Sequence, residues 1–258
     1  MCHLPDGFKV VSVMYPPIPS HPERPTRRPV MRQTWANIVW CHWPVEPAAV
    51  AAVLPDGLTP DLHEGKAWVG LIPFAMEDLR LANCLRFVTR WLRSAYFGEV
   101  NVRTYVIGPD GQRGVWFCTL DADSVLGVAT ANVALGLPYR VATTKFSGDS
   151  HRWDWYSRRR DGAVAALDVR ITDEPARAAH AGLETFLLER YALYSVWHGR
   201  ILRGELHHEP WRVRTATLQN VTTETVEAAG FTVLATPHVL VGDPVEVSVF
   251  RPSVVGGR

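Results

Sequence analysis

Residues 96–105 constrain the fold most, because polar and apolar side chains alternate along this β-favouring segment. Successive side chains of a strand point to opposite faces, so Glu99, Asn101 and Arg103 share one face and apolar residues occupy most of the other. The pattern fits a half-buried antiparallel strand with a solvated polar face. It also fits a polar stripe inside a barrel, where such groups bind a ligand. Both interpretations stay open at this point.

A turn sequence, Gly108-Pro109-Asp110-Gly111, separates the strand predicted at 95–107 from another at 113–121, which indicates an antiparallel hairpin. Further strands are predicted at 34–43, 66–76, 83–91, 138–147, 150–158 and 163–172, and in the remainder of the chain beyond about residue 190, including 239–250. Helices are predicted at 47–54, 124–135 and about 180–190. This order predicts an α+β protein built around a closed or nearly closed, mostly antiparallel sheet with two or three peripheral helices. Closure leaves room for an internal cavity.

The chain of 258 residues, 47% of them hydrophobic, is expected to form one domain. Six prolines between residues 15 and 30 favour irregular structure, so residues 1–31 are interpreted as a proline-rich arm. The domain proper is expected at 32–250, followed by a C-terminal tail at 251–258. An arm that wraps a neighbouring copy makes a homo-oligomer one expectation.

The formal net charge of +1 provides no field for nucleic acid or a membrane surface, so neither partner is expected. No signal-peptide pattern and no run of 18 apolar residues occurs, which predicts a cytoplasmic protein. The four cysteines contain no C-x-x-C pair, which argues against a zinc ribbon or a redox motif. We expect no cofactor.

Histidines at 198, 207 and 208, with Glu209, raise the question of a metal site. Adjacent side chains of a strand face opposite ways, and the spacing matches no established zinc pattern. Ordinary hairpin histidines are therefore the favoured interpretation, and no metal is predicted. Their role stays open.

Five segments, in matching order and spacing, resemble the YqjF-like family of uncharacterised bacterial proteins: 99–105, 114–122, 137–139, 186–194 and 208–211. The resemblance covers about residues 32–250. That family is similar in fold to acetoacetate decarboxylase. It therefore implies an acetoacetate-decarboxylase-like β-barrel with an internal cavity.

The resemblance also shows where the decarboxylase chemistry is missing. In the decarboxylases a lysine forms a Schiff base beside a second cation. The matching segment here places Tyr139 at the nucleophile's position and Arg140 at the second cation's. Of the three lysines, Lys145 has the same strand parity as Tyr139, but six residues of strand separate them by about 20 Å. Lys9 and Lys66 lie in terminal or turn-like contexts, so the imine chemistry is not expected.

The same resemblance matches Glu99 to the cavity carboxylate and Arg32 to the arginine that contacts the substrate carboxylate. A second acidic residue of the decarboxylase site has no counterpart at 68–71. We therefore predict that Glu99 acts as a general acid or base and that Tyr139 donates to the same substrate oxygen. The predicted ligand is a small organic acid or a β-dicarbonyl-like metabolite. Its carboxylate or enolate is expected to be bound by four residues: Arg32, Asn101, Arg103 and Arg140.

Two alternatives remain beside a lyase-like or isomerase-like catalyst. Glu99 and Arg103 could form a structural ion pair inside the barrel. The cavity could also bind or sense a small carboxylate or carbonyl compound and catalyse nothing.

Overall fold

The computed structural model describes residues 17–18, 22–82, 96–123 and 136–257. The strand predicted at 83–91 and the helix predicted at 124–135 therefore lie outside the described residues. The described strands are β1 (Met31–Ala36), β2 (Ile38–Val45), β3 (Thr59–Pro60), β4 (Ala67–Leu81), β5 (Phe97–Ile107), β6 (Arg113–Ala122), β7 (Tyr139–Gly148), β8 (Arg152–Arg159), β9 (Val164–Ile171), β10 (Arg177–Ala178), β11 (Ala192–Trp197), β12 (Arg200–His207), β13 (Arg212–Thr223), β14 (His238–Gly242), β15 (Val245–Val249) and β16 (Ser253–Gly257). The described helices are α1 (Pro47–Ala51), α4 (Leu183–Leu188) and α5 (Glu224–Glu227).

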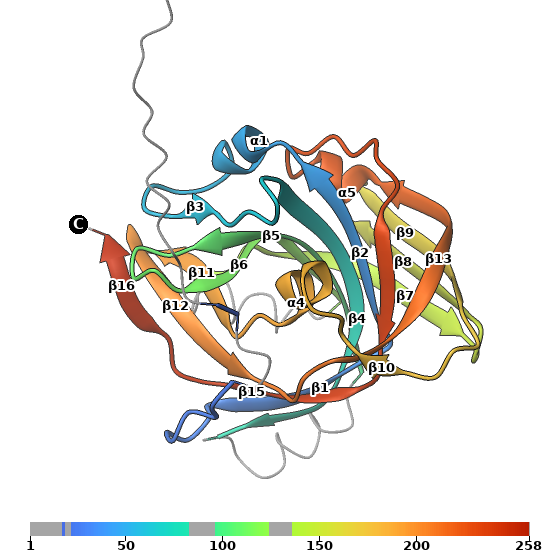
Figure 1. The fold of residues 1–258 in the computed structure, drawn as a ribbon, viewed down its shortest axis with the longest axis horizontal. Helices are drawn as coiled ribbons and strands as arrows, with labels where there is room; N and C mark the ends of the chain where they lie inside the picture. The colour runs from blue at the N-terminus through green and yellow to red at the C-terminus, as the bar shows by residue number, and fades with distance from the viewer. Residues whose placement is uncertain (1–16, 19–21, 83–95, 124–135, 258) are drawn as a thin grey trace, which may run out of the picture.

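The strands close into two rings that share β4, β5 and β6 (Figure 1). One ring, called here the α4 ring, runs β1-β15-β12-β11-β6-β5-β4 and returns to β1. The second ring runs β6-β7-β8-β9-β13-β14-β2-β4-β5 and returns to β6. All these pairings are antiparallel except β11 with β6 and β6 with β7. The prediction of a closed, mostly antiparallel sheet with few short helices is confirmed.

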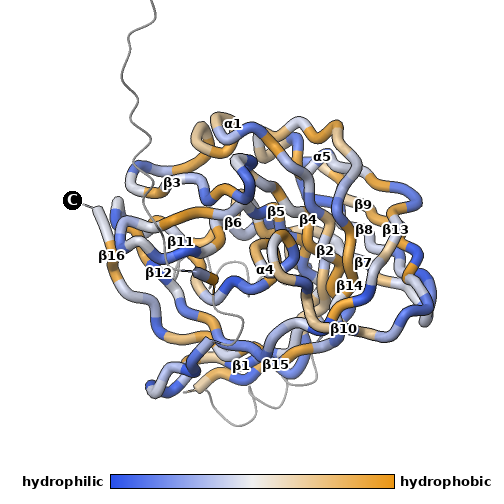
Figure 2. Tube along the Cα trace, viewed as in Figure 1, coloured by the Kyte–Doolittle hydropathy of each residue, from blue (hydrophilic) through white to orange (hydrophobic). Residues whose placement is uncertain are grey.

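The helix α4 lies inside the α4 ring, where Figure 1 shows it enclosed by strands. It follows Gly182, whose φ of 86° is accessible to glycine without strain. Phe186, Leu187 and Leu188 are all buried and pack against aromatic side chains from the surrounding strands. In Figure 2 the helix is largely coloured as hydrophobic, while both colours alternate along the neighbouring strands. An apolar helix therefore fills much of the ring that the sequence predicted to be a cavity.

The strand β5 separates two hydrophobic clusters, one on each of its faces. Val100 and Val102 belong to the cluster of the second ring, whereas Tyr105 belongs to the cluster around α4. By alternation, the polar residues predicted to share a face lie on the Tyr105 side. Glu99 and Asn101 are each 4% exposed and Arg103 is 5% exposed. The polar stripe is thus interior, and the interpretation as a solvated strand face is wrong.

Two predicted strands are each interrupted in the structure. The segment expected as one strand at 34–43 bends at Asn37, whose φ is 52°, so that β1 and β2 have different partners. Asparagine enters this left-handed region more readily than most residues, which allows the break. The segment expected at 239–250 divides between β14 and β15 at Asp243 and Pro244.

The described part of the proline-rich arm lies against the domain. Arg27 forms an ion pair of 2.5 Å with Glu205 and lies over the ring of Phe250. Ile18 packs against the cluster around α4. Within the predicted tail, β16 pairs with β12. The division into arm, domain and tail stays a prediction.

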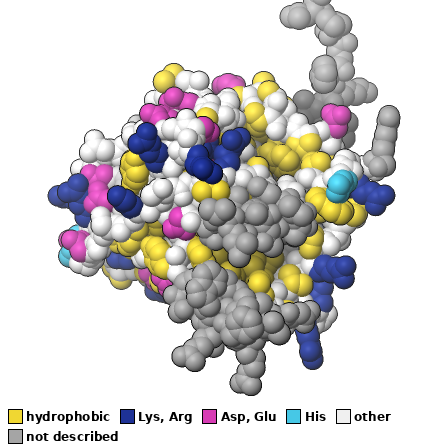
Figure 3. Space-filling model, turned by 180° about the vertical axis from the view of Figure 1, so that it is seen from behind, with side chains coloured by type: hydrophobic (Ala, Val, Ile, Leu, Met, Phe, Trp, Pro, Cys, Tyr) yellow, Lys and Arg dark blue, Asp and Glu magenta, His cyan; other side chains and the backbone are white. Residues whose placement is uncertain are grey.

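Among the side chains that Figure 3 shows in colour, basic and acidic ones are interspersed with apolar ones. No helix among the described residues is long and apolar enough to cross a membrane.

Candidate functional site

The centre of the candidate site is a hydrogen bond between Glu99 and Tyr139. The Tyr139 hydroxyl donates to Oε2 of Glu99 at 2.8 Å. Glu99 lies on β5 and Tyr139 on β7, and β6 lies between these two strands in the sheet. Leu120 of β6 pairs with Asn101 on one side and with Tyr139 on the other. This register brings a phenol and a carboxyl group together although they are 40 residues apart in the chain.

Burial makes the carboxyl group of Glu99 unusually basic. Desolvation raises the pKa of Glu99 from 4.5 to about 7, although hydrogen bonds from Tyr139 and Asn101 favour the charged form. The nearby Asp121 carboxylate raises it further. Desolvation and the adjacent Glu99 also raise the pKa of Tyr139 well above 10. The pair therefore consists of a neutral phenol donor and a carboxyl group that gains or loses a proton near neutral pH.

Asn101 completes the group next to Glu99. Its side chain hydrogen-bonds to the Glu99 carboxylate, and its Oδ1 is buried without a hydrogen-bond partner. A buried amide oxygen of this kind can accept a hydrogen bond from a ligand hydroxyl.

Arg103 lies on the same face of β5 but points toward the end of α4. Its Nη2 donates to the carbonyl oxygen of Leu187 at 2.9 Å and to the hydroxyl of Tyr105 at 3.1 Å. The guanidinium lies 4.7 Å from the ring centroid of Trp40. The ion pair considered between Arg103 and Glu99 does not form. Arg103 instead donates to the carbonyl oxygen of Leu187. A carbonyl group at the C-terminal end of a helix has no partner within the helix.

The structure places the other two predicted arginines at the surface. The side chain of Arg32 is 40% exposed and lies 3.8 Å from Glu246. That of Arg140 is 59% exposed and lies 3.8 Å from Asp161. Of the six predicted site residues, the structure thus brings together Glu99, Asn101 and Tyr139. The binding roles of Arg32 and Arg140 stay predictions.

The two described lysines lie away from the pair. Lys66 is exposed in the turn that it forms with His63. Lys145 is exposed on β7, where it pairs with Tyr156 of β8 in an open hollow on the sheet surface. Neither lysine stands next to Tyr139, and Lys9 lies outside the described residues.

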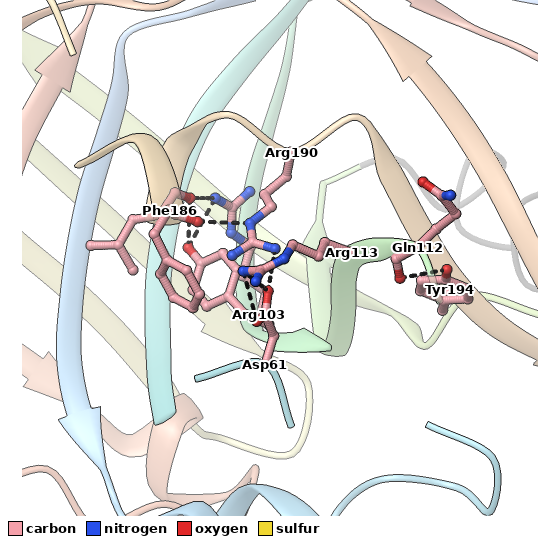
Figure 4. A network of polar contacts seen from close by, with 9 residues as sticks. Asp61, Arg103, Gln112, Arg113, Phe186, Arg190 and Tyr194 are labelled. Carbon is pink, nitrogen blue, oxygen red and sulfur yellow. Dashed lines mark hydrogen bonds and ion pairs between the residues drawn. The ribbon is translucent and has the colours of Figure 1, made fainter. Parts of the chain in front are cut away.

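A buried ionic network near α4 had no signal in the sequence (Figure 4). Asp61 is 1% exposed and accepts hydrogen bonds from Arg113 at 3.0 Å and from Arg190 at 2.7 Å. Arg190 also donates to the carbonyl oxygen of Phe186 and lies over its ring. Asp61 and Arg190 are 129 residues apart, so no local pattern could predict their contact.

His208 is buried rather than placed on an open hairpin. Its ring makes tilted contacts with the rings of Tyr191 and Trp211, at centroid distances of 4.6 Å and 5.3 Å. Desolvation lowers the pKa of His208 to about 4, so the imidazole is neutral near pH 7. His207 ends β12 and His198 lies in the turn before it. Among the described residues, no cluster of three or more histidine, cysteine or acidic side chains could hold a metal ion.

Comparison with solved structures places this fold in the acetoacetate-decarboxylase-like class. The enduracididine biosynthesis enzyme MppR, solved in complex with pyruvate, matches with a TM-score of 0.63 at 13% identity, over 90% of this chain and 93% of that one. An acetoacetate decarboxylase from Legionella pneumophila matches with a TM-score of 0.63 at 12% identity, over 89% of this chain and 88% of that one. At this level of identity the likeness establishes the fold alone.

Sequence comparison gives the family itself. The uncharacterized protein YqjF of Bacillus subtilis is 32% identical over 205 residues, which cover 79% of this chain and 83% of that protein. The model of the family DUF2071, described as an uncharacterized conserved protein, matches residues 32–246. The chain belongs to the DUF2071 family, and the resemblance to YqjF-like proteins is confirmed.

Proposed function

We propose that this protein binds a small organic acid or a β-dicarbonyl-like metabolite at the Glu99–Tyr139 pair and transfers a proton by acid/base catalysis. The observation that carries the proposal is a carboxyl group 4% exposed, with a pKa of about 7, hydrogen-bonded to a neutral phenol. A general base is most effective when its pKa lies near the working pH. Burial of such a carboxyl group in an apolar interior lowers the stability of the fold, which favours a functional role for it over a purely structural one.

The chemistry that suits the pair is proton removal from a carbon next to a carbonyl group. Deprotonated Glu99 would accept that proton, and the Tyr139 hydroxyl would donate a hydrogen bond to the oxygen on which negative charge develops. Asn101 would orient the substrate through its amide. A structural relative, MppR, was solved with pyruvate, and a ligand of that class carries both a carbonyl and a carboxylate group. The reaction class is therefore lyase-like or isomerase-like.

Schiff-base chemistry is not part of the proposal, because Tyr139 stands at the lysine's position and the described lysines are exposed elsewhere. Incubation with pyruvate or acetoacetate and then borohydride is expected to add no mass to the protein. Intact-mass spectrometry measures this directly. A reduced adduct mapped to Lys9, Lys66 or Lys145 would contradict the proposal.

Glu99→Gln tests the catalytic role directly. The amide can still accept the Tyr139 hydrogen bond but cannot take a proton, so turnover of a substrate is expected to fall by about 10²-fold or more. Wild-type kcat/KM is expected to rise with pH through an inflection near 7, the pKa of Glu99. The substrate is found by thermal-shift screening of small carboxylates and dicarbonyl compounds, followed by a turnover assay on each hit.

Tyr139→Phe is the companion variant, since it removes only the hydroxyl group. We expect it to retain ligand-induced stabilisation and to lose turnover. If ligands stabilise the wild type but none is converted, the same site is a binding or sensing module. This second function is favoured by the missing nucleophile, because a scaffold without its lysine can retain groups that bind a ligand and lose the reaction.

A further inference from the structure

A second hollow lies between the start of β6, the exit of α4 and the β11–β12 hairpin. It measures about 240 Å³, smaller than the 300–1,000 Å³ of pockets for drug-sized ligands. Its lining includes Arg113, Arg190, Arg203, Glu189 and Glu205, and the arm residues Pro17 and Ile18 contribute to its wall. Figure 4 shows Arg113 and Arg190 meeting at Asp61. The lining is strongly polar and arises from segments far apart in the sequence.

The unusual part of the hollow is the pair Arg113 and Arg190, which share one carboxylate. Both guanidinium groups bond to Asp61, so this group of three carries one net positive charge. The side chain of Arg190 is 2% exposed, and its Nη2 is buried with no hydrogen-bond partner. The Nε of Arg113 is likewise buried with no partner. A buried donor without an acceptor destabilises the folded protein, and a charged donor does so more strongly.

The other charged side chains of the hollow also have hydrogen-bond or ion-pair partners. Arg203 bonds to Asp110 and Glu205, and Glu205 also pairs with Arg27, so two cations meet two carboxylates. Glu189 accepts hydrogen bonds from the Trp211 backbone N–H and from Tyr191. The buried N–H groups of the hollow that have no acceptor belong to Arg113, Arg190 and Arg203.

We propose that this hollow is a binding site for a small oxyanion, held by the free N–H groups of Arg190 and Arg113. A carboxylate or a phosphate has the oxygen spacing that a guanidinium binds through two parallel hydrogen bonds. Its oxygens would accept hydrogen bonds from donors that otherwise have no acceptor. The volume admits a small organic acid or inorganic phosphate rather than a larger metabolite. The site is separate from the Glu99–Tyr139 pair and does not depend on its chemistry.

Titration with two probes, acetate and inorganic phosphate, tests the proposal on the full chain. Isothermal calorimetry and thermal shift are expected to show saturable binding of one of the two, which also identifies the class of anion. Arg113→Gln is expected to weaken that binding about tenfold or more, because it removes a charge-assisted hydrogen bond. Arg113 is 23% exposed, which makes it more replaceable than Arg190.

Two variants complete the design. Arg152→Gln removes the same charge at the surface, where the Arg152 side chain is 60% exposed, and is expected to leave binding unchanged. Glu99→Gln should also leave it unchanged, so failure of this proposal and failure of the acid/base proposal are distinguishable. If Arg113→Gln does not fold, Arg113→Lys replaces it. Lysine keeps the positive charge but lacks the parallel N–H donors of the guanidinium, so this variant is expected to weaken binding measurably. Absence of saturable binding, or wild-type affinity in a folded Arg113 variant, would overturn the proposal.

Discussion

Asp61→Asn is expected to lower the free energy of unfolding by about 3–5 kcal/mol, the range found when one partner of a buried ion pair is removed. The carboxylate is the shared partner of Arg113 and Arg190, and Arg190 is 2% exposed. Asparagine preserves the shape but leaves two cations near each other without a counter-charge. Urea unfolding at pH 7, followed by tryptophan fluorescence, measures the change.

The matched control is Asp161→Asn, in a pair of exposed side chains. Asp161 is 54% exposed and lies 3.8 Å from Arg140, a geometry for which ion pairs contribute about 0–1 kcal/mol. We expect a loss within that range. If Asp61→Asn lowered the free energy of unfolding no more than Asp161→Asn does, the buried network would have no main role in stability. If the oxyanion probe restored part of the stability that Asp61→Asn loses, this network would be linked to the proposed hollow.

Local patterns were sufficient to predict most strands of this fold. The hairpin between β5 and β6 follows from alternation and from the turn, in which Gly111 has a φ of 74°. The two rings did not follow from local patterns, because closure depends on the pairing of β1 with β4 and β15, segments that are distant in the chain. The enclosed position of α4 was also missed, since a helix of six residues that includes Glu184 and Thr185 is too short and too mixed for its pattern to distinguish a buried helix from a surface helix.

The candidate site was predicted in part, and the reason differs for each residue. Glu99 and Tyr139 were found by comparing the sequence with the decarboxylase pattern, and the structure joins them by a hydrogen bond. Arg103 was placed correctly on the interior face, yet its partner is a helix carbonyl rather than a carboxylate. A strand pattern gives the face of a side chain but not the direction of a long, flexible one. The contact of Asp61 with Arg190 depends entirely on tertiary structure.

Glu99→Gln is expected to stabilise the protein at pH 8 and to have little effect on stability near pH 4. Burial raises the pKa of Glu99 to about 7 in the folded state, against an ordinary value of 4.5. The folded state then binds the proton more tightly than the unfolded chain, so stability falls as the pH rises through this interval. Each unit of pKa difference corresponds to about 1.4 kcal/mol, which gives a gain of roughly 3 kcal/mol for the variant above pH 7.

The measurement is the difference in free energy of unfolding between wild type and Glu99→Gln, taken from urea unfolding at several values between pH 4 and 8. The pH dependence of this difference reports the titration of Glu99 alone. All other groups titrate in both proteins, so their contributions cancel where these groups do not interact with Glu99. Glu246→Gln, in which a side chain 49% exposed is changed, is the control and is expected to shift stability by less than about 1 kcal/mol. A pH-independent difference for Glu99→Gln would show that its carboxyl group has an ordinary pKa, and the acid/base proposal would then lose its main support. A gain that appears between pH 4.5 and 7 would instead show that the fold retains this carboxyl group at a cost in stability, as expected for a group kept for its chemistry.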